Sequence, residues 1–214
     1  MGRGFVVVNY LKITDYDGRV YCGGNQSWFD DVVMINSGCG IVAALDNVLL
    51  AAGIDKISKA EYKNLLTEAS KIVRPRMFPF KVKQRKIFGG TFMGSFGVTF
   101  GILRRKAVKL AAGRDLDIKV RVFRTGHASK VTAALKEGRP VIMLITAPLQ
   151  NLRMYWEVEP KNVSHQGFHW VTIIDENETN YIVSSWGERY LIPKEDVNKK
   201  SVLVRFALLD IKGR

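Results

Sequence analysis

Cysteine is scarce in this chain, whose 214 residues include only Cys22 and Cys39. Two thiols are too few for a disulfide scaffold or for a zinc site built from thiolates, although they could pair with each other. Long hydrophobic runs are also missing, since no apolar stretch reaches the roughly 18 residues of a membrane span. Residues 1–10 lack the apolar length and the cleavage site of a secretory signal. We therefore expect a cytoplasmic protein with no membrane span.

Motifs for bound groups are missing as well. The sequence has no zinc-finger spacing, no aromatic RNA-binding signature and no Gly-rich loop with the lysine that cradles phosphates. We therefore expect neither a cofactor nor a metal. Hydrophobic residues make up 47% of the chain and charged residues 25%, which is ordinary for a globular protein. The length suits one domain, or two closely packed lobes that share a cleft.

One cysteine stands at the start of an expected helix. Asn36-Ser-Gly-Cys-Gly40 opens an apolar run that ends at Gly53. The apolar residues at helical spacing within it are Ile41, Leu45, Val48, Leu49 and Ala52. Cys39 would lie in the first turn of this helix, where unpaired N–H groups favour a thiolate. The alternative is a small core residue, which is the usual role of a free cysteine.

A histidine begins a segment with the pattern of an antiparallel hairpin. Residues 168–175 are expected to form one strand, residues 175–179 a turn and residues 180–184 a second strand. Residues near the open ends of such a hairpin face each other, so we expect His169 and Ser184 within hydrogen-bonding reach. A catalytic imidazole needs such a partner on its other ring nitrogen.

Together these segments resemble the papain-like cysteine peptidases, including their compact bacterial and bacteriocin-processing relatives. Ser37-Gly-Cys-Gly40 heads a helix, and His169 starts a strand. Ser184-Ser-Trp-Gly187 matches the family's Asn-Ser-Trp-Gly in all but its first residue. The resemblance implies an α+β fold in one catalytic domain, residues 1–214. A helical lobe of about residues 25–115 would pack against an antiparallel sheet lobe of about residues 116–214, joined by an N-terminal strand.

The resemblance also implies an activity, that of a cysteine peptidase or amidase that forms an acyl-enzyme. Cys39 would be the nucleophile and His169 the general base and acid. Trp186 would take the place of the indole that shields the histidine's hydrogen bond from water. An acyltransferase on the same fold would use the same residues. In such an enzyme we expect the Cys39 thiol to be unusually acidic.

The third member of the triad departs from the family pattern. Ser184 stands where the family has Asn, and a hydroxyl is a smaller acceptor for an imidazole N–H that must also rotate its own proton away. Asp175 is a rival orienting group, although it lies at the turn end of the hairpin, opposite His169.

The oxyanion donor also departs from the pattern. The family's Gln usually lies about six residues before the cysteine, where this chain has Val33. The nearest side-chain amides are those of Gln26 and Asn25, and either would require an extra loop or turn over residues 30–36. The alternative is a turn in which Asn25 and Ser27 act only as caps.

Positive charge is concentrated in one segment. Residues 71–114 contain twelve Lys or Arg and no Asp or Glu, within a chain of net charge +13. Aromatic residues interleave with these cations, as in surfaces that bind single-stranded nucleic acid or another anionic partner. The alternative is a solvated face that keeps the protein soluble. This segment motivates a second hypothesis, a weak or inactive papain-fold protein that binds an anionic partner through its basic face and has an ordinary Cys39 thiol.

Other elements follow from pattern. Ser58 and Glu61 fit a capping box at the start of a helix. Strands are expected over residues 5–10 and 118–123, and a helix over residues 97–113. His127 lies near an expected helix start, where capping or exposure is its expected role. His165 is expected near the cleft mouth, because Gly167 and the strand pattern oppose the helix that a metal pair with His169 would need.

Overall fold

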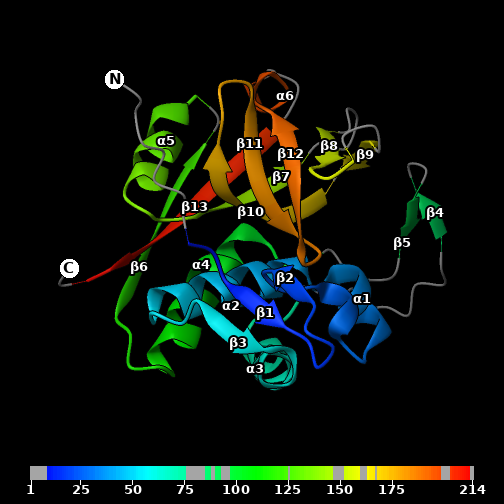
Figure 1. The fold of residues 1–214 in the computed structure, drawn as a ribbon, viewed down its shortest axis with the longest axis vertical. Coiled ribbons are helices and arrows are strands. Elements are labelled where there is room, and N and C mark those ends of the chain that lie inside the picture. The colour runs from blue at the N-terminus through cyan, green and yellow to red at the C-terminus, as the bar shows by residue number, and fades with distance from the viewer. Residues whose placement is uncertain are drawn as a thin grey trace.

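The chain folds into a layer of helices packed against an eight-stranded antiparallel sheet, an α+β arrangement (Figure 1). The structure is a computed structural model that describes residues 9–75, 85–87, 90–92, 97–124, 126–146, 152–159, 163–166, 168–198 and 203–212. The described helices are the short 3₁₀ turn η1 (Gln26–Trp28), α1 (Val32–Ser37), α2 (Cys39–Ala51), α3 (Lys59–Ile72), α4 (Phe100–Ala112), α5 (Ala128–Lys136) and α6 (Lys194–Asn198).

The large sheet has the strand order β6-β13-β7-β10-β11-β12-β8-β9. Its strands are β6 (Ile118–Arg124), β7 (Val141–Thr146), β8 (Leu152–Trp156), β9 (Val163–Gln166), β10 (Phe168–Glu176), β11 (Asn180–Ser185), β12 (Glu188–Pro193) and β13 (Leu203–Ile211). Each described pair of neighbours in it is antiparallel. A separate hairpin joins β4 (Arg85–Ile87) to β5 (Gly90–Phe92).

Helix α2 is the centre of the helical layer, and it lies between α3, α4 and strand β10. Its residues from Gly40 to Leu49 are all buried, because apolar residues occur on every side of the helix, and the polar Asp46 and Asn47 are buried among them. Gly40 permits a close approach to the neighbouring elements. A Cβ at this position would lie 2.7 Å from Cβ of Val98 and 2.9 Å from Cδ1 of Trp170, distances that the packed side chains do not allow.

The capping box before α3 is confirmed. The Ser58 hydroxyl accepts from the Glu61 N–H at 3.2 Å, and the Glu61 carboxylate accepts from the Ser58 N–H at 3.2 Å. The helix expected over residues 97–113 is also present, but it begins at Phe100 with Thr99 as its N-cap. Threonine supplies the side-chain oxygen that the first turn requires, which the apolar periodicity alone did not indicate.

Two clusters of apolar side chains pack on the two faces of the large sheet. One lies between the sheet and helices α2, α3 and α4, and the other lies between the sheet and α5. Strand β10 contributes to both because its side chains alternate: Trp170 and Ile174 belong to the first cluster, and Val171 and Ile173 to the second. The large sheet therefore has an apolar core on each face, and β10 contributes side chains to both.

The N-terminal strands lie with the helices. Strands β1 (Lys12–Thr14), β2 (Val20–Cys22) and β3 (Lys56–Ser58) form a three-stranded sheet, and β1 packs on α3. The strand expected over residues 5–10 falls mostly outside the described residues, and residues 9 and 10 are not in a strand. The described part of the N-terminal region thus gives no strand to the large sheet, where the sequence had placed one.

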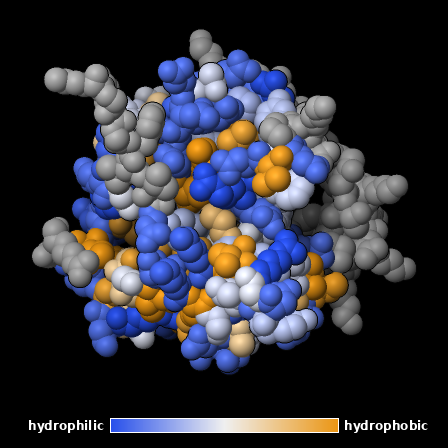
Figure 2. All heavy atoms as spheres, in the orientation of Figure 1, coloured by the Kyte–Doolittle hydropathy of each residue, from blue (hydrophilic) through white to orange (hydrophobic). Residues whose placement is uncertain are grey.

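Hydrophilic and hydrophobic residues are interspersed over the face seen in Figure 2, where the hydrophobic atoms do not merge into one large patch. Among the described helices, none combines the length and the apolar character that crossing a bilayer requires.

Candidate active site

Cys39 is the first residue of α2. Gly38 immediately before it is at once the C-cap of α1 and the N-cap of α2, so the nucleophile candidate stands at the junction of two helices. The Gly38 carbonyl accepts from the N–H groups of Ile41 and Val42, which leaves the Cys39 N–H at the open end of the helix. The expected position of Cys39 in the first turn is therefore confirmed.

His169 lies near the start of β10 and is buried, with 5% of its surface exposed. Cys39 and His169 line the same pocket, whose volume of about 10 Å³ holds one water molecule. Imidazole Nε2 lies 2.7 Å from the hydroxyl oxygen of Ser185. The fold therefore brings together the two segments that are 130 residues apart in the sequence, and it provides the imidazole with a hydrogen-bond partner.

The expected contact between His169 and Ser184 is wrong by one residue. The Ser184 hydroxyl instead donates to the Cys22 carbonyl at 2.7 Å. The cause is a β-bulge in β10, because the register with β11 shifts between Ile173 and Asp175. Near the turn Asp175 pairs with Ile182, but beyond the bulge Thr172 pairs with Ser184.

The bulge exchanges the faces of the two serines. Residues opposite each other in an antiparallel ladder share a face, and successive residues alternate between faces. Without the shift Ser184 would lie opposite Ile173, on the face of His169. With it Ser184 lies opposite Thr172, and Ser185 takes the face of His169.

Asp175 lies away from the imidazole, six residues further along β10, which corresponds to roughly 20 Å of strand. Its carboxylate accepts from the N–H of Glu176 at 2.8 Å. The rival orienting role of Asp175 is therefore wrong for this arrangement.

Trp186 covers the histidine. Its ring stacks on the imidazole with centroids 4.5 Å apart and an interplanar angle of 21°. Trp186 and Gly187 form the two-residue turn between β11 and β12, and both have positive φ, 50° and 78°. Such a turn matches the twist of the flanking strands, but a non-glycine residue at positive φ is strained. The strained turn holds the indole against the imidazole, where the resemblance had placed it.

Burial favours the neutral forms of both groups. It lowers the pKa of His169 from 6.5 to about 4. Burial also raises the pKa of the Cys39 thiol. Hydrogen bonds from the backbone N–H groups of Trp170, Gly40 and Cys39 lower this pKa, but they offset the effect of burial only in part. The acidic thiol expected from the sequence is therefore wrong for this structure, and its resting pair is a thiol and a neutral imidazole.

The two side-chain amides upstream take different roles. Gln26 lines the pocket of Cys39 and His169, and its Nε2 donates to the Ile35 carbonyl at 2.6 Å. Its Oε1 is buried and finds no hydrogen-bond partner in the part of the chain that the structure describes. Asn25 caps η1 through the Ser27 N–H and donates to the Trp186 carbonyl at 2.7 Å. The extra turn expected over residues 30–36 contains helix α1.

A buried carboxyl that the sequence pattern did not single out lies along the same helix. Asp46 of α2 is 1% exposed and lines the pocket. It accepts hydrogen bonds from the Tyr10 hydroxyl at 3.0 Å, the Tyr62 hydroxyl at 2.5 Å and the Gly24 N–H at 3.0 Å. Burial raises its pKa from 3.8 to about 6, although these hydrogen bonds oppose the shift. Its place seven residues after Cys39, on the same helix face, was the available signal.

The remaining candidates lie apart from this chemistry. Cys22 and Cys39 are both free thiols, and burial raises the pKa of Cys22 to about 12. His127 is the N-cap of α5 without a side-chain cap bond, and its ring meets Phe123 edge to face. The side chain of His165 lies outside what the structure describes. Among the described residues, no group of three His, Cys, Asp or Glu is placed to hold a metal ion.

The basic segment 71–114 falls only in part on described residues. Its described portion is the end of α3, residues up to 75, β4, β5, and residues 97–114 with α4, which carries four cations. Its role with an anionic partner stays a prediction.

Comparisons with known proteins add the following. No protein-family model matches this sequence, and no curated protein shows significant similarity to it. A solved structure with a similar fold is that of a Bacillus anthracis protein, whose description as a C39-like peptidase is itself provisional. The two are 16% identical, the match covers 83% of this chain and 91% of the other, and the TM-score is 0.46. At this level the similarity assigns no role to any residue here.

Proposed function

We propose that this protein is a cysteine hydrolase that cleaves peptide or amide bonds through an acyl-enzyme. One observation carries the proposal: the thiol of Cys39, at a helix N-terminus, shares a pocket with His169, whose imidazole is hydrogen-bonded by Ser185 and covered by Trp186. A nucleophile, a base and a group that orients the base are the parts that nucleophilic catalysis requires.

The proposed reaction begins from the neutral pair. In the proposed tautomer the Nε2–H of His169 donates to Ser185, 2.7 Å away, which makes Nδ1 the basic nitrogen. Nδ1 takes the thiol proton as Cys39 Sγ attacks the carbonyl carbon. The tetrahedral intermediate collapses when the imidazolium returns this proton to the leaving amine. Water, deprotonated by the same nitrogen, then attacks the thioester and releases the acid and the free thiol.

The oxyanion would be held by two donors. The Cys39 N–H lies at the open end of α2, and Nε2 of Gln26 carries a second N–H besides the one bonded to Ile35. Donors fixed before the reaction stabilise the developing charge most, and removal of one typically lowers kcat about 100-fold or more. Gln26 is held by that bond at the pocket wall.

The test is hydrolysis of a mixture of peptides, monitored by mass spectrometry. The Cys39→Ser and His169→Ala variants should each lose the activity, whereas Cys22→Ser should keep it. Retention of full activity by Cys39→Ser would refute the proposal. Addition of an amine such as glycinamide distinguishes the two outcomes of the acyl-enzyme, since an acyltransferase would form the amide product in place of the acid.

The pH dependence of alkylation provides a test that needs no substrate. Iodoacetamide should react with Cys39 in the Cys22→Ser protein at a rate that is flat between about pH 5 and 8, because His169 is neutral there and acts as base. In the His169→Ala variant the rate should fall and should rise about tenfold per pH unit, as for an unassisted thiol below its pKa. Identical profiles in the two proteins would mean that the pair does not function.

A further inference from the structure

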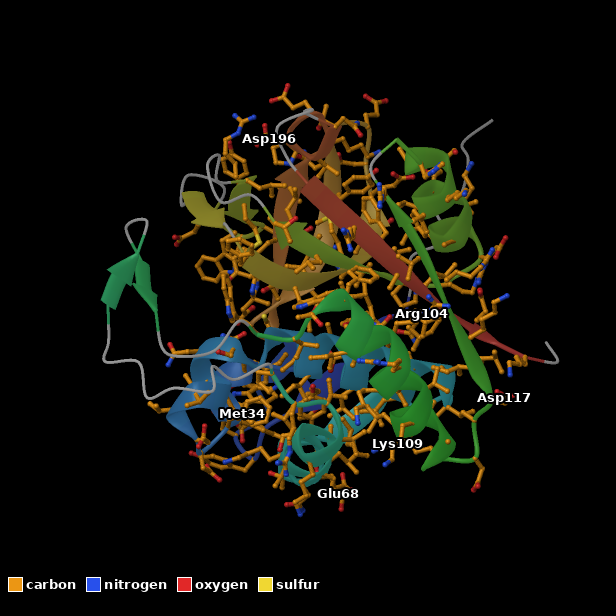
Figure 3. All side chains as sticks on the ribbon, turned by 180° about the vertical axis from the view of Figure 1, so that it is seen from behind. Met34, Glu68, Arg104, Lys109, Asp117 and Asp196 are labelled. Carbon is orange, nitrogen blue, oxygen red and sulfur yellow. The ribbon has the colours of Figure 1, made fainter. Side chains whose placement is uncertain are left out.

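A second pocket lies at the opposite end of the large sheet from β8 and β9, where β6 is the edge strand. Its volume is about 490 Å³, and it lies between α5 and strands β6 and β13. Arg104 reaches it from α4, and Figure 3 labels this residue on the side of α4 next to β6. Two strands, β13 and β7, separate this edge from the strand that carries His169. A volume of this size is typical of ligand sites.

The pocket is strongly basic. Its cations are Arg104, Lys119, Arg121, Lys130 and Arg139, and the acidic residue in its lining is Glu137. Arg121 and Arg139 are neutralised, because both bind Asp210 and Arg139 also binds Glu137. The other three cations form no ion pair with any residue that the structure describes. This excess positive charge attracts an anionic ligand.

The edge strand also offers backbone hydrogen-bonding groups. The N–H of Lys212, just after β13, donates to the carbonyl of Asp117, just before β6, at 2.9 Å. Bonded and non-bonded pairs alternate along an antiparallel ladder, so Lys119 and Arg121 form bonded pairs with β13. The N–H and C=O groups of Val120 and Val122 therefore point outward, away from β13. Val122 is 42% exposed, so this part of the sheet edge is open to solvent.

From this arrangement we propose that the pocket binds an acidic peptide segment in an extended conformation, which adds a strand to the outer edge of β6. Main-chain bonds to Val120 and Val122 would supply affinity. Acidic side chains on the α5 face of the added strand would meet Lys119 and Lys130, and those on the α4 face would meet Arg104.

The same features disfavour other occupants. A second copy of this chain would pair β6 with β6 and place Lys119, Arg121 and Arg124 against like charges. Single-stranded nucleic acid needs exposed aromatic faces on which bases stack. Phe123 is the aromatic residue of the lining, and its ring is already stacked on Phe206 at 5.2 Å with Lys130 above it. A free phosphate would fill little of the volume.

Fluorescence anisotropy tests the proposal with the full chain. The probe is a fluorescein-labelled, end-blocked hexapeptide, Glu-Glu-Val-Val-Glu-Glu, which presents Glu on both faces of an extended strand, and its control has Lys in place of Glu. We expect the acidic peptide to bind with a Kd of about 0.1 mM and the basic peptide at least about tenfold more weakly. Equal affinities, or no binding of either peptide up to about 2 mM, would overturn the proposal.

Two pairs of variants separate strand addition from charge. Val122→Pro removes an outward N–H without breaking a ladder bond, so the fold should persist and the affinity for the acidic peptide should fall about tenfold. Val122→Thr keeps the N–H and should bind as the unaltered protein does. Arg104→Glu should also weaken binding about tenfold, whereas Arg105→Glu, on the same helix outside the pocket lining, should change it less than about twofold.

Two further outcomes are decisive. If Val122→Pro does not fold, Val122→Asp replaces it. The added carboxylate at the strand edge should lower the affinity for the acidic peptide by a similar factor. A ten-nucleotide oligothymidylate serves as the competitor. If it displaces the peptide while neither Val122 variant changes the affinity, the surface binds anions through charge alone and strand addition is wrong.

Discussion

Imidazole Nε2 of His169 and the hydroxyl of Ser185 lie 2.7 Å apart, and the two residues are 16 positions apart in the sequence. Both side chains are buried, so their hydrogen bond is screened from water and holds the imidazole in its orientation. The bulge in β10 decides that this serine, and not its neighbour, faces the histidine.

The first prediction concerns the two serines as a matched pair. Ser185→Ala should lower kcat about fivefold, because the imidazole loses the hydroxyl that orients it, a loss equivalent to one hydrogen bond of about 1 kcal/mol. Ser184→Ala should leave kcat unchanged and lower only the unfolding free energy, since its hydroxyl bonds the Cys22 carbonyl. A larger loss of kcat in the Ser184 variant would contradict the assignment.

A second substitution at this position, Ser185→Asp, should change the pKa of His169. A carboxylate beside the ring stabilises the imidazolium, so the pKa of His169 should rise from about 4. The Cε1–H resonance of His169, followed by NMR against pH, measures this shift. An unchanged midpoint would mean that position 185 does not face the ring.

The second prediction concerns the strained turn. Trp186→Ala removes the ring stacked on His169 and keeps a Cβ at φ 50°, whereas Trp186→Gly removes both. The glycine variant should be the more stable of the two by about 1 kcal/mol, because glycine adopts positive φ without strain. Chemical denaturation measures the difference. In both variants water should reach the imidazole and raise the pKa of His169 towards 6.5.

The third prediction concerns stability against pH, to which two buried groups contribute with opposite sign. The pKa of His169 is lowered from 6.5 to about 4, so the unfolded chain binds more protons and stability falls as the pH drops from about 6.5 to 4. The pKa of Asp46 is raised from 3.8 to about 6, so the folded chain binds more protons and stability falls as the pH rises from about 4 to 6. Each contribution is on the order of 3 kcal/mol.

Single variants should separate these contributions. The unfolding free energy of Asp46→Asn should increase with pH between about 4 and 6.5, because only the histidine remains. That of His169→Gln should decrease with pH between about 4 and 6, because only the carboxyl remains. Urea denaturation at several pH values provides the measurement, and the double variant is the control. Equal slopes in the two single variants would show that one of the shifts has the wrong sign.

The fourth prediction separates the neighbouring amides. Gln26→Ala should reduce kcat about 100-fold with little effect on KM, because an oxyanion donor acts mainly in the transition state. Asn25→Ala should instead lower the unfolding free energy by about 1 kcal/mol, since it removes the cap of η1 and the bond to the Trp186 carbonyl. Comparable kinetic losses in both variants would indicate that the loop, and not one amide, supports the reaction.

Local patterns predicted much of this fold. The apolar run after Cys39 and the capping box at Ser58 define α2 and α3, because helix periodicity and caps are properties of adjacent residues. The hairpin of β10 and β11 was predicted for the same reason. These elements position the nucleophile and the base.

What the sequence could not supply depends on register and on distant contacts. A one-residue bulge within β10 leaves no mark in an apolar strand, yet it exchanges Ser184 for Ser185. The raised pKa of Asp46 depends on Tyr10 and Tyr62, which converge only in the folded chain. The pKa directions of Cys39 and His169 follow from the depth of burial, which residue type and spacing do not specify.

Helix α1 determines the spacing of the two proposed oxyanion donors, Nε2 of Gln26 and the N–H of Cys39. Gln26 is bonded to the Ile35 carbonyl within α1, and α1 ends at the glycine that begins the helix of Cys39. This six-residue helix sets the distance and the relative rotation of the two groups, since each residue of a helix advances about 1.5 Å and turns about 100°. The length of this segment is therefore constrained, because one residue more or less would rotate one donor away from the other.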